Sequence, residues 1–409
     1  MRLPRTISFA LAAALAAGPG LGQLPLPLGP MSPVNSSTAA NQSGAVIGMA
    51  PDGSFRVAWS SFVNDPREIV TRGFDAAGTP GANDIFLNTF TTGNQASPAF
   101  AMNASGDWVG AWISTDQFGP SSDQDAIARF TTANGTVLQA EFLAQDDSFG
   151  DPEQVAVARH SDDSFVVVRL EDDTLRAHRY GPTGASLGGD ETVGADANVG
   201  TIDVAALPAG RSVVVFDASA LPTTDVVGRF VESDGSGSGL PFPVDADGPG
   251  ADTHPSVAAD GRGGFVVVWN DAEGDIVARR FRADGTPIGG IQLVEAANGQ
   301  VTGAPDVAMA SDGGFVVVWS RGADFESEGI FAREFSRTGS PATSVFIVST
   351  AAGDHEAASA AIGDRRYAFA WQGPDAEADG IFARRYQRRV IFGDGFESGD
   401  VGYWSSSDL

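Results

Sequence analysis

The sequence predicts an all-β protein folded as a seven-bladed β-propeller of four-stranded antiparallel blades. Three observations support this prediction. A segment recurs seven times, each copy contains a pattern of four short strands, and an N-terminal segment resembles the strand that the last copy lacks. A fixed period of a few tens of residues is typical of repeat architectures, in which each copy forms one structural unit.

The recurring segment is clearest as Asp-Gly-Gly-Phe-Val-Val-Val-Trp, which ends at Trp319, and a closely similar copy ends at Trp269. Weaker copies end at Trp59, Trp112, Arg169, Phe216 and Trp371. The gaps between successive copies are 53, 57, 47, 53, 50 and 52 residues, with a mean of 52. This length suits one propeller blade of four short strands.

Each copy reads as four strands joined by turns, and the fifth copy shows the pattern best. Its first strand covers residues 255–259, and the glycine-rich stretch 260–264 allows the positive φ angles of a tight turn. The second strand, 265–269, is apolar at every position, as expected for a sheet buried on both faces. A third strand, 276–281, and a fourth, 291–294, complete the blade.

An aromatic residue ends the third strand of every copy: Phe74, Phe130, Tyr180, Phe230, Phe281, Phe335 and Tyr386. The seventh copy has no evident fourth strand, and residues 27–36, ahead of the first copy, resemble one. We therefore expect the N-terminal segment to complete blade seven and close the ring, which would remove exposed sheet edges. An open β-solenoid or two smaller sheet domains is the alternative.

The two ends of the chain differ from the repeats. Residues 1–22 read as a secretory signal peptide, because Arg2 and Arg5 precede an apolar run that is too short to span a bilayer. The propeller is then expected over 23–389, followed by a C-terminal tail over 390–409. No other stretch predicts a transmembrane segment. A cytosolic protein with an apolar start is the alternative to export.

Composition narrows the classes of partner. The chain has 52 acidic and 25 basic residues and a net charge of −27, so nucleic acid and anionic membranes are poor partners. It has no cysteine, which excludes disulfides and thiolate chemistry. All basic residues are arginine, and the absence of lysine excludes Schiff-base chemistry and a phosphate-loop lysine. We expect a monomer.

The repeat resembles that of a known group of proteins. The succession Asp-Gly-Gly-Phe-Val-Val-Val-Trp, Gly-Ile-Phe-Ala-Arg-Arg and Gly-x-Pro is similar to the blade repeat of secreted bacterial β-propeller proteins whose function is uncharacterised. The resemblance covers residues 26–389. It is strong in blades five and six and weaker in blades three and four, where Arg169 and Phe216 replace the tryptophan.

A second resemblance lies at the C-terminus. Residues 391–400, which include Phe-Glu-Ser-Gly-Asp, together with Trp404, are similar to a short tail shared by many secreted Gram-negative proteins. The resemblance implies a protein secreted from, or held on the outer surface of, a Gram-negative bacterium, with the tail serving in sorting or surface retention. A strand or clasp packed on the propeller is the alternative role.

An arginine precedes the third-strand aromatic in every blade: Arg72, Arg129, Arg179, Arg229, Arg279, Arg333 and Arg384. A ring of seven cations could form an anion funnel. A residue present in every copy is more often part of the scaffold, because function in repeat proteins is found where the copies differ. We therefore interpret these arginines as contacts to aromatic rings or to acids between blades.

The loop between the second and third strands is a candidate cation site. Three blades carry carboxylates at every second position in this loop: Asp271, Glu273 and Asp275; Asp324, Glu326 and Glu328; Asp375, Glu377 and Asp379. A tight loop with this spacing can direct several oxygens to one point, as Ca²⁺ requires. No copy has the complete calcium-loop motif with a distal bidentate glutamate. A solvated acidic hairpin is the alternative.

Blade three departs most from the repeat and is a candidate ligand site. It has Arg169 in place of the tryptophan and places His160, Arg176 and His178 nearby in sequence. In so acidic a protein, such a cationic group could bind an anionic sugar or an acidic partner. Drift in a degenerate repeat is the alternative. Trp108 in blade two is an additional tryptophan, which could stack on a sugar or pack in the core.

Motifs for catalysis are weak. The other two histidines, His254 and His355, precede first strands, where a surface position is expected, and the sequence has neither a His-Glu-x-x-His motif nor a Gly-x-Ser-x-Gly elbow. The Asp-Gly repeat resembles the Asp-box of sialidases, but the interval from Asp312 to Trp319 does not fit that motif.

These observations favour an exported extracellular or cell-surface binding or adhesion module without catalytic activity, with calcium as the candidate stabilising ion. Its partner would be an extracellular carbohydrate or protein. The alternative is a polysaccharide-directed glycoside hydrolase or lyase on a propeller scaffold. A catalytic propeller should gather perturbed titratable groups from several blades at one point.

Overall fold

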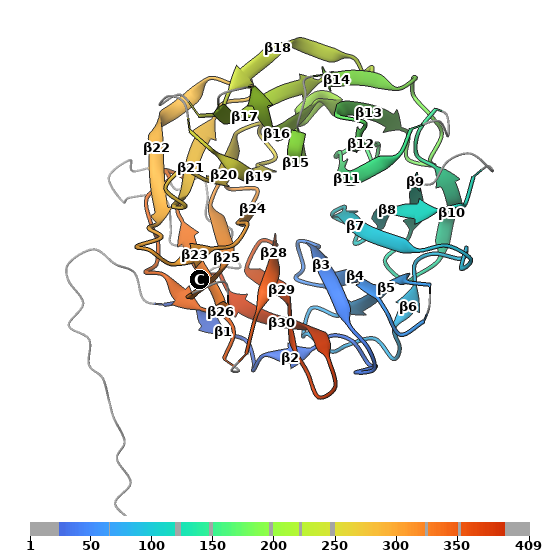
Figure 1. Cartoon of the computed structure of the whole chain (residues 1–409), viewed down its shortest axis with the longest axis horizontal. Helices are drawn as coiled ribbons and strands as arrows, with labels where there is room; N and C mark the ends of the chain where they lie inside the picture. The colour runs from blue at the N-terminus through green and yellow to red at the C-terminus, as the bar shows by residue number, and fades with distance from the viewer. Residues whose placement is uncertain are drawn as a thin grey trace, which may run out of the picture.

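Seven antiparallel sheets surround a central axis in the computed structural model, and Figure 1 shows the ring in the view down this axis. The structure describes residues 24–388 except 65, 119–123, 147–149, 196–198, 221–222, 246–249, 324–325 and 351–352. The expected signal peptide and the C-terminal tail therefore lie outside the described residues. The prediction of a seven-bladed, all-β propeller is confirmed.

The first four blades follow one another along the chain, each starting with its innermost strand. Blade one consists of β3 (Gln42–Met49), β4 (Phe55–Ser61), β5 (Glu68–Phe74) and β6 (Ile85–Phe86). Blade two consists of β7 (Gln95–Met102), β8 (Trp108–Thr115), β9 (Gln124–Thr131) and β10 (Val137–Leu143). Blade three consists of β11 (Pro152–Arg159), β12 (Phe165–Glu171), β13 (Thr174–Tyr180) and β14 (Glu191–Ala195). Blade four consists of β15 (Val199–Ala206), β16 (Ser212–Ala220), β17 (Thr223–Val231) and β18 (Gly237–Pro243).

The last three blades keep the same order. Blade five consists of β19 (Thr253–Ala259), β20 (Phe265–Asn270), β21 (Ile276–Phe281) and β22 (Pro287–Glu295). Blade six consists of β23 (Val301–Thr302), β24 (Asp306–Met309), β25 (Phe315–Ala323), β26 (Glu326–Phe335) and β27 (Phe346–Ile347). Blade seven consists of β28 (Glu356–Ile362), β29 (Arg366–Pro374) and β30 (Asp379–Gln387), with β1 (Leu26–Pro27) and β2 (Ser32–Pro33) outside them.

Blade seven joins the two ends of the chain. In β1, Leu26 pairs with Gln387, and in β2, Ser32 pairs with Ala383, so the N-terminal segment supplies the missing outer strand. The closure predicted from residues 27–36 is confirmed. Just after β30, Nη2 of Arg388 donates to the carboxylate of Asp312 in blade six, at 2.6 Å from Oδ1 and 2.8 Å from Oδ2.

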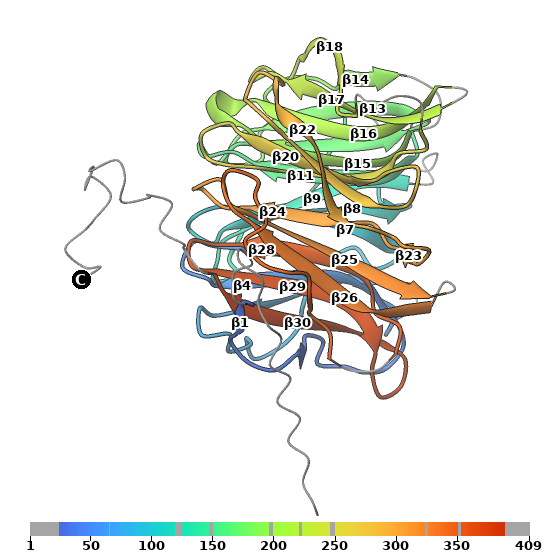
Figure 2. The same cartoon turned by 90° about the vertical axis from the view of Figure 1, so that its left-hand side faces the viewer.

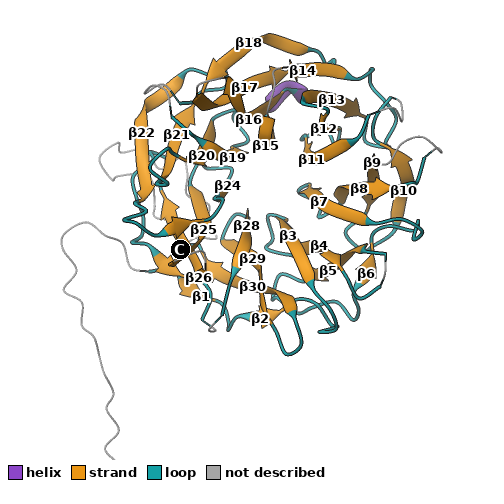
Figure 3. Cartoon of the chain, in the orientation of Figure 1, coloured by secondary structure: helices purple, strands orange, loops and turns teal. Residues whose placement is uncertain are grey.

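Loops connect the strands at both ends of the ring, as the side view in Figure 2 shows. In the described part of the chain, the only helix is the 3-10 turn Pro208–Gly210, drawn purple in Figure 3. No helix there is long and apolar enough to cross a lipid bilayer.

The core lies between blades, because each second strand is buried on both faces. In β20, Trp269 packs in a cluster with Val215 of blade four, whereas Val268 packs in a cluster with Trp319 of blade six. Successive side chains of a strand point to opposite faces, so an apolar residue is needed at every position of a strand covered on both sides. This explains the unbroken run Phe-Val-Val-Val-Trp.

The indole N–H of the repeated tryptophan is paired at the start of the first strand. It donates to a side chain sixteen or seventeen positions earlier in four blades: Trp59 to Gln42 (2.7 Å), Trp112 to Gln95 (2.7 Å), Trp269 to Asp252 (3.0 Å) and Trp371 to His355 (3.2 Å). Blade four has Phe216 and, at the matching position, the apolar Val199. The surface position expected for His355 is wrong, because this buried acceptor is fully enclosed.

The repeated arginines tie neighbouring blades together. In six blades this arginine donates through Nη1 to a backbone carbonyl of the preceding blade's outer strand region: Arg72 to Val34, Arg129 to Leu87, Arg229 to Val193, Arg279 to Val244, Arg333 to Val294 and Arg384 to Val348. Blade three is the exception. Its register places His178 opposite Val167, where blade one places Arg72 opposite Val57.

Candidate functional site

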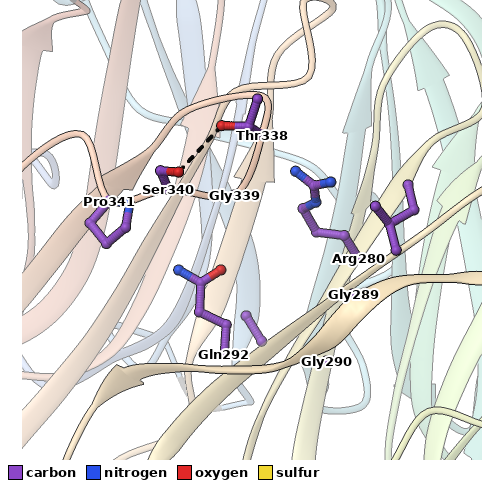
Figure 4. A pocket seen from close by; sticks show the side chains of 10 residues that line it. Arg280, Gly289, Gly290, Gln292, Thr338, Gly339, Ser340 and Pro341 are labelled. Carbon is purple, nitrogen blue, oxygen red and sulfur yellow. Dashed lines mark hydrogen bonds between the residues drawn. The ribbon is translucent and has the colours of Figure 1, made fainter.

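A groove with a volume of about 370 Å³ lies between blades five and six. Arg280 and Gln292 line it from blade five, and Thr338 and Ser340 line it from the turn between β26 and β27. Figure 4 shows the side chains of Arg280 and Gln292 directed towards this turn. The groove therefore presents a guanidinium, an amide and two hydroxyl groups from two adjacent blades.

Glycine residues shape both walls of this groove. Gly339 has a φ of +85°, and a Cβ there would lie 3.1 Å from Nη1 of Arg280 and 3.3 Å from Oε1 of Gln292. The turn can therefore approach these two side chains closely only without a side chain of its own. On the blade-five wall, Gly289 and Gly290 have no atom within 4 Å of an added Cβ, so their backbone faces open space.

Arg280 is the charged group of the groove. Its Nη1 donates to the backbone carbonyl of Arg337 at 2.7 Å, which fixes the guanidinium at the rim of blade six. Burial lowers the pKa of Arg280 below its ordinary value. No carboxylate is among the residues that line the groove. The groove therefore presents hydrogen-bond donors and one positive charge, in a protein whose net charge is −27.

Sequence reasoning missed this groove. The sequence did contain one indication of it. Two arginines, Arg279 and Arg280, are adjacent in blade five, and only Arg279 belongs to the arginines repeated in every blade, which leaves Arg280 without a repeated role. Blade seven has the same pair, and there Nη1 of Arg385 donates to the carbonyl of Ala76 in blade one at 3.1 Å. The position after the ring arginine thus reaches forward to the turn of the next blade, and in blade five it also borders open space.

The residues of the cationic group predicted in blade three do not form one site in the structure. Arg169 is buried, and it forms ion pairs with Glu171 (Nε to Oε2, 2.9 Å) and with both oxygens of Asp190 (Nη1 to Oδ1, 2.7 Å). Arg176 lies 3.6 Å from Glu171. The two guanidinium groups that were predicted to bind an anionic ligand therefore pair with acidic residues of the protein itself.

His160 lies apart from that ion-pair network. It follows β11 and is buried, and its Nε2 lies 3.3 Å from Oγ of Ser212 in blade four. Burial, together with the nearby charge of Arg179, lowers the pKa of His160 to about 4. His160 is therefore neutral at pH 7 and adds no charge to a ligand site.

His178 remains with the buried acids of blade three. Its Nδ1 lies 2.9 Å from Oδ1 of Asp190 and 3.4 Å from Oδ1 of Asp146, which follows the outer strand of blade two. Within the described residues, this is the one group of three metal-ligating side chains whose ligand atoms lie within 4.8 Å of one another. Burial alone would raise the pKa of Asp190, but its contacts with His178 and Arg169 hold it below its usual value.

Trp108 is enclosed by the protein. Its side chain is 3% exposed and stacks on Phe100 with ring centroids 5.3 Å apart. The guanidinium of Arg56 lies 5.0 Å from the centroid of the indole ring. An indole ring in this position packs in the core and has no free face for a sugar.

The acidic loops use several of their carboxylates as turn acceptors. Oδ1 of Asp271 accepts from the backbone N–H groups of Glu273 (3.1 Å) and Asp275 (2.9 Å), and Asp275 accepts from Ala297 at 2.7 Å. Neither this loop nor the one with Asp375, Glu377 and Asp379 brings three ligand oxygens within 4.8 Å in the part of the chain that the structure describes.

The blade-six loop is only partly visible in the structure. Asp324 lies outside the described residues, as do the side chains of Glu326 and Glu328. In blade seven, Oδ1 of Asp375 accepts from the N–H groups of Glu377 (3.0 Å) and Ala378 (3.1 Å). The calcium assignment for all three loops stays a prediction.

Two carboxyl groups and a hydroxyl group meet on the first strands of blades four to six, which lie nearest the central axis in Figure 1. Oγ of Ser256 lies 3.1 Å from Oδ2 of Asp203 and 2.8 Å from Oδ1 of Asp306. A hydroxyl group has one proton to donate, so the second contact requires a proton on a carboxyl group. Burial, with the charge of Asp306, raises the pKa of Asp203 to about 7.

The same carboxyl groups also hold the inner strands together. Asp203 accepts from the N–H of Val257 in blade five at 2.8 Å, and Asp306 accepts from the N–H of Ala360 in blade seven at 2.7 Å. Burial also raises the pKa of Asp306. Carboxyl groups with raised pKa values can serve acid–base chemistry, and here they also bridge four adjacent blades.

The fold is a β-propeller, and the groups described above, namely the groove, the ion pairs of blade three and the buried carboxyl groups, lie between its blades. No family model matches the sequence, and no curated protein does so either. Among solved structures, the chain is similar to a protein of unknown function from Dyadobacter fermentans DSM 18053, with 10% identity and a TM-score of 0.55 over 91% of this chain and 100% of that chain.

Two glycoside-cleaving enzymes show weaker likeness. The Hadza microbial sialidase Hz136 has 10% identity and a TM-score of 0.48 over 85% of this chain and 66% of that chain. The α-L-arabinofuranosidase Arb93A from Fusarium graminearum has 11% identity and a TM-score of 0.47 over 88% of this chain and 97% of that chain. At such identities the comparisons establish the propeller fold and say nothing about activity.

Proposed function

We propose that this chain is an exported, non-catalytic binding module of the extracellular space or cell surface, and that it binds an oxygen-rich anionic saccharide in the groove between blades five and six. The groove itself is the observation that supports the proposal. Arg280 supplies a planar guanidinium that suits a carboxylate or sulfate group. Gln292, Thr338 and Ser340 add hydrogen-bonding groups for hydroxyls.

Charge also supports an anionic ligand at this place. A net charge of −27 repels polyanions from most of the surface, so a groove without carboxylates is where a polyanion meets the least repulsion. The apolar Ile288, which is 37% exposed, borders the same groove and offers a surface for a sugar ring.

Binding of an oligogalacturonate, compared with a neutral galactan oligomer of equal length, tests the proposal by titration calorimetry. We expect binding of the charged oligomer only, weakened at least tenfold in Arg280→Gln. Arg385→Gln is the matched control, because it removes the same kind of contact to a neighbouring turn outside the groove. Equal binding by Arg280→Gln and the unmodified protein would contradict the assignment to this groove.

Calcium in the second-to-third-strand loops is part of the proposal. Blade five supports it, because burial and the charge of Asp245 raise the pKa of Asp252 to about 7, and the charge of Asp271 adds to this effect. A divalent cation would relieve this repulsion. We expect millimolar calcium to raise the melting temperature relative to excess EDTA, and the joint substitution of Asp271, Glu273 and Asp275 by asparagine or glutamine to reduce that rise. An unchanged response would contradict the assignment for blade five.

A polysaccharide-directed hydrolase or lyase is the second candidate function, and the Asp203–Ser256–Asp306 group is the observation that favours it. This group joins two carboxyl groups and one hydroxyl group from three blades near the axis, and both carboxyl groups have raised pKa values. We expect any such activity to disappear in Asp203→Asn and in Asp306→Asn while binding in the groove is retained. Full activity in both variants would exclude this pair as the catalytic group.

A further inference from the structure

His178 occupies a position that the other six blades give to arginine. Those arginines reach the backbone of the preceding blade, whereas His178 is too short to do so and instead faces two carboxylates. One carboxylate, Asp146, follows the outer strand of blade two, and the other, Asp190, precedes the outer strand of blade three. The substitution thus replaces a cationic contact between two blades with a set of metal-ligating atoms.

The two carboxylates are oriented by each other's backbone. The N–H of Asp146 donates to Oδ2 of Asp190 at 2.9 Å, and the N–H of Asp190 donates to Oδ2 of Asp146 at 2.6 Å. The two Oδ1 atoms lie 3.4 Å (Asp146) and 2.9 Å (Asp190) from Nδ1 of His178, and Oδ1 of Asp190 also accepts from Nη1 of Arg169 at 2.7 Å. Gly189 allows this approach, because a Cβ there would lie 2.9 Å from Oδ2 of Asp146.

A hydroxyl group outside this cluster fixes the tautomer of His178. Oγ of Ser186 donates to the carbonyl of Gly188, which can only accept. The contact of 2.8 Å between Oγ of Ser186 and Nε2 of His178 therefore requires the proton on Nε2. In the neutral imidazole, Nδ1 then carries a lone pair directed at two carboxylate oxygens.

A cation between these three atoms would be stabilised by all three lone pairs. A proton on Nδ1 would satisfy Asp190 at 2.9 Å but leave Asp146 at 3.4 Å, beyond a good hydrogen bond. A metal ion can be shared by all three atoms. The side chain of Asp146 is 47% exposed, which gives an ion access from solvent, whereas that of His178 is 2% exposed.

We propose that Oδ1 of Asp146, Nδ1 of His178 and Oδ1 of Asp190 bind a divalent transition-metal ion of the Zn²⁺ class, with water in the remaining position. One imidazole nitrogen and two carboxylate oxygens suit Zn²⁺, whereas Ca²⁺ takes oxygen ligands. Ser186 on the distal nitrogen and Arg169 on Asp190 supply the outer contacts that orient metal ligands. The ion would join blades two and three as the arginines join the other blades.

Metal binding to the mature full-length chain tests this proposal. After treatment with EDTA and removal of the chelator, we expect one equivalent of Zn²⁺ to bind in titration calorimetry and to raise the melting temperature. Co²⁺ bound at the same site should give visible absorption bands that Zn²⁺ abolishes. Calcium at equal concentration should neither displace Co²⁺ from this site nor alter its absorption bands.

Four variants locate the site. Asp146→Asn, at an exposed position, should lower Zn²⁺ affinity at least tenfold, and Ser186→Ala should lower it about tenfold through the outer contact. His178→Arg, which introduces the residue of the other blades, should abolish binding in a folded protein. His254→Gln is the control for an exposed histidine and should change nothing. Binding that survives in Asp146→Asn, or no Zn²⁺ binding by the unmodified chain, overturns the proposal and leaves a protonated His178 as the cation.

Discussion

At the scale of single residues, the blades differ by substitutions that compensate one another. In four of the five blades whose second strand ends in tryptophan, a polar residue at the start of the first strand accepts the indole proton, as Gln95 does for Trp112. Where the strand ends in Phe216, the matching residue is the apolar Val199. A buried N–H without an acceptor is costly, and this cost explains why the two positions change together.

Removing the acceptor alone should therefore be costly. We expect Gln95→Val to lower the free energy of unfolding by about 1–3 kcal/mol, because it leaves the buried indole N–H of Trp112 unpaired. The double variant Gln95→Val with Trp112→Phe copies blade four and should lose less than the two single changes added together. Urea denaturation of the three variants measures this, and strict additivity would count against the pairing.

The raised pKa of Asp203 near the axis should make stability depend on pH. The pKa of Asp203 is raised from 3.8 to about 7, so between these values the folded state binds more protons than the unfolded state. The contribution of this group is therefore fully present below about pH 4 and is lost as the pH rises through 7. We expect Asp203→Asn to flatten the fall in melting temperature between pH 4 and pH 7. An identical pH profile in the variant would show that Asp203 titrates normally.

At the scale of strands and turns, the sequence predicted the elements that recur in every blade. It did not predict the alignment of the ring position in blade three, which differs by one residue. The second strands, the tight turns and the N-terminal strand of blade seven follow from apolar runs and glycine positions. In blade three, the ring position was assigned to Arg179, but the register gives it to His178. The spacing between the ring arginine and the aromatic varies by one residue among blades, and only strand pairing reveals the alignment.

The candidate sites were harder to predict for a related reason. The sequence identified Arg169, Arg176 and His178 but predicted that they bind an anionic ligand. The acids that contact Arg169 and His178 come from separate segments, which spacing along the chain does not reveal. Asp190 precedes β14, and Asp146 follows the blade-two strand β10. The groove with Arg280 depends on two adjacent blades and on the absence of side chains at Gly289 and Gly339. Spacing along one copy does not contain that information.

The arginine contacts between blades should be measurable at this scale. Nη1 of Arg333 donates to the carbonyl of Val294 at 2.9 Å. We expect Arg333→Gln to lower the free energy of unfolding by about 2 kcal/mol, because a charged donor to a buried carbonyl is lost. Arg282→Gln, at an exposed turn position, should leave it unchanged and serves as the control. Equal denaturation midpoints for both variants would contradict a structural role for the ring.

At the scale of the whole molecule, stability depends on closure of the ring. Each blade buries its second strand against two neighbours, so an open ring would expose an apolar face as well as the outer edge of β30. Closure by β1 and β2, and the contact of Arg388 with Asp312, hold blade seven in place.

Deleting residues 24–34 should therefore affect the entire fold. We expect a lower melting temperature and association of the chain in size-exclusion chromatography, because β30 loses its partner strands and can pair with another molecule. Deleting residues 391–409 is the control, and we expect it to leave the melting temperature unchanged. A monomeric N-terminal deletion with an unchanged melting temperature would show that closure contributes little.

The pairing of Leu26 with Gln387 also sets the time at which the protein can finish folding. The two strands are separated by about 360 residues of chain, so the last blade cannot form until Gln387 has been synthesised. Contacts between such distant segments form slowly. Under the proposal that the chain is exported, it would pass through the export channel before the ring closes, and blade seven would form only after β30 had emerged.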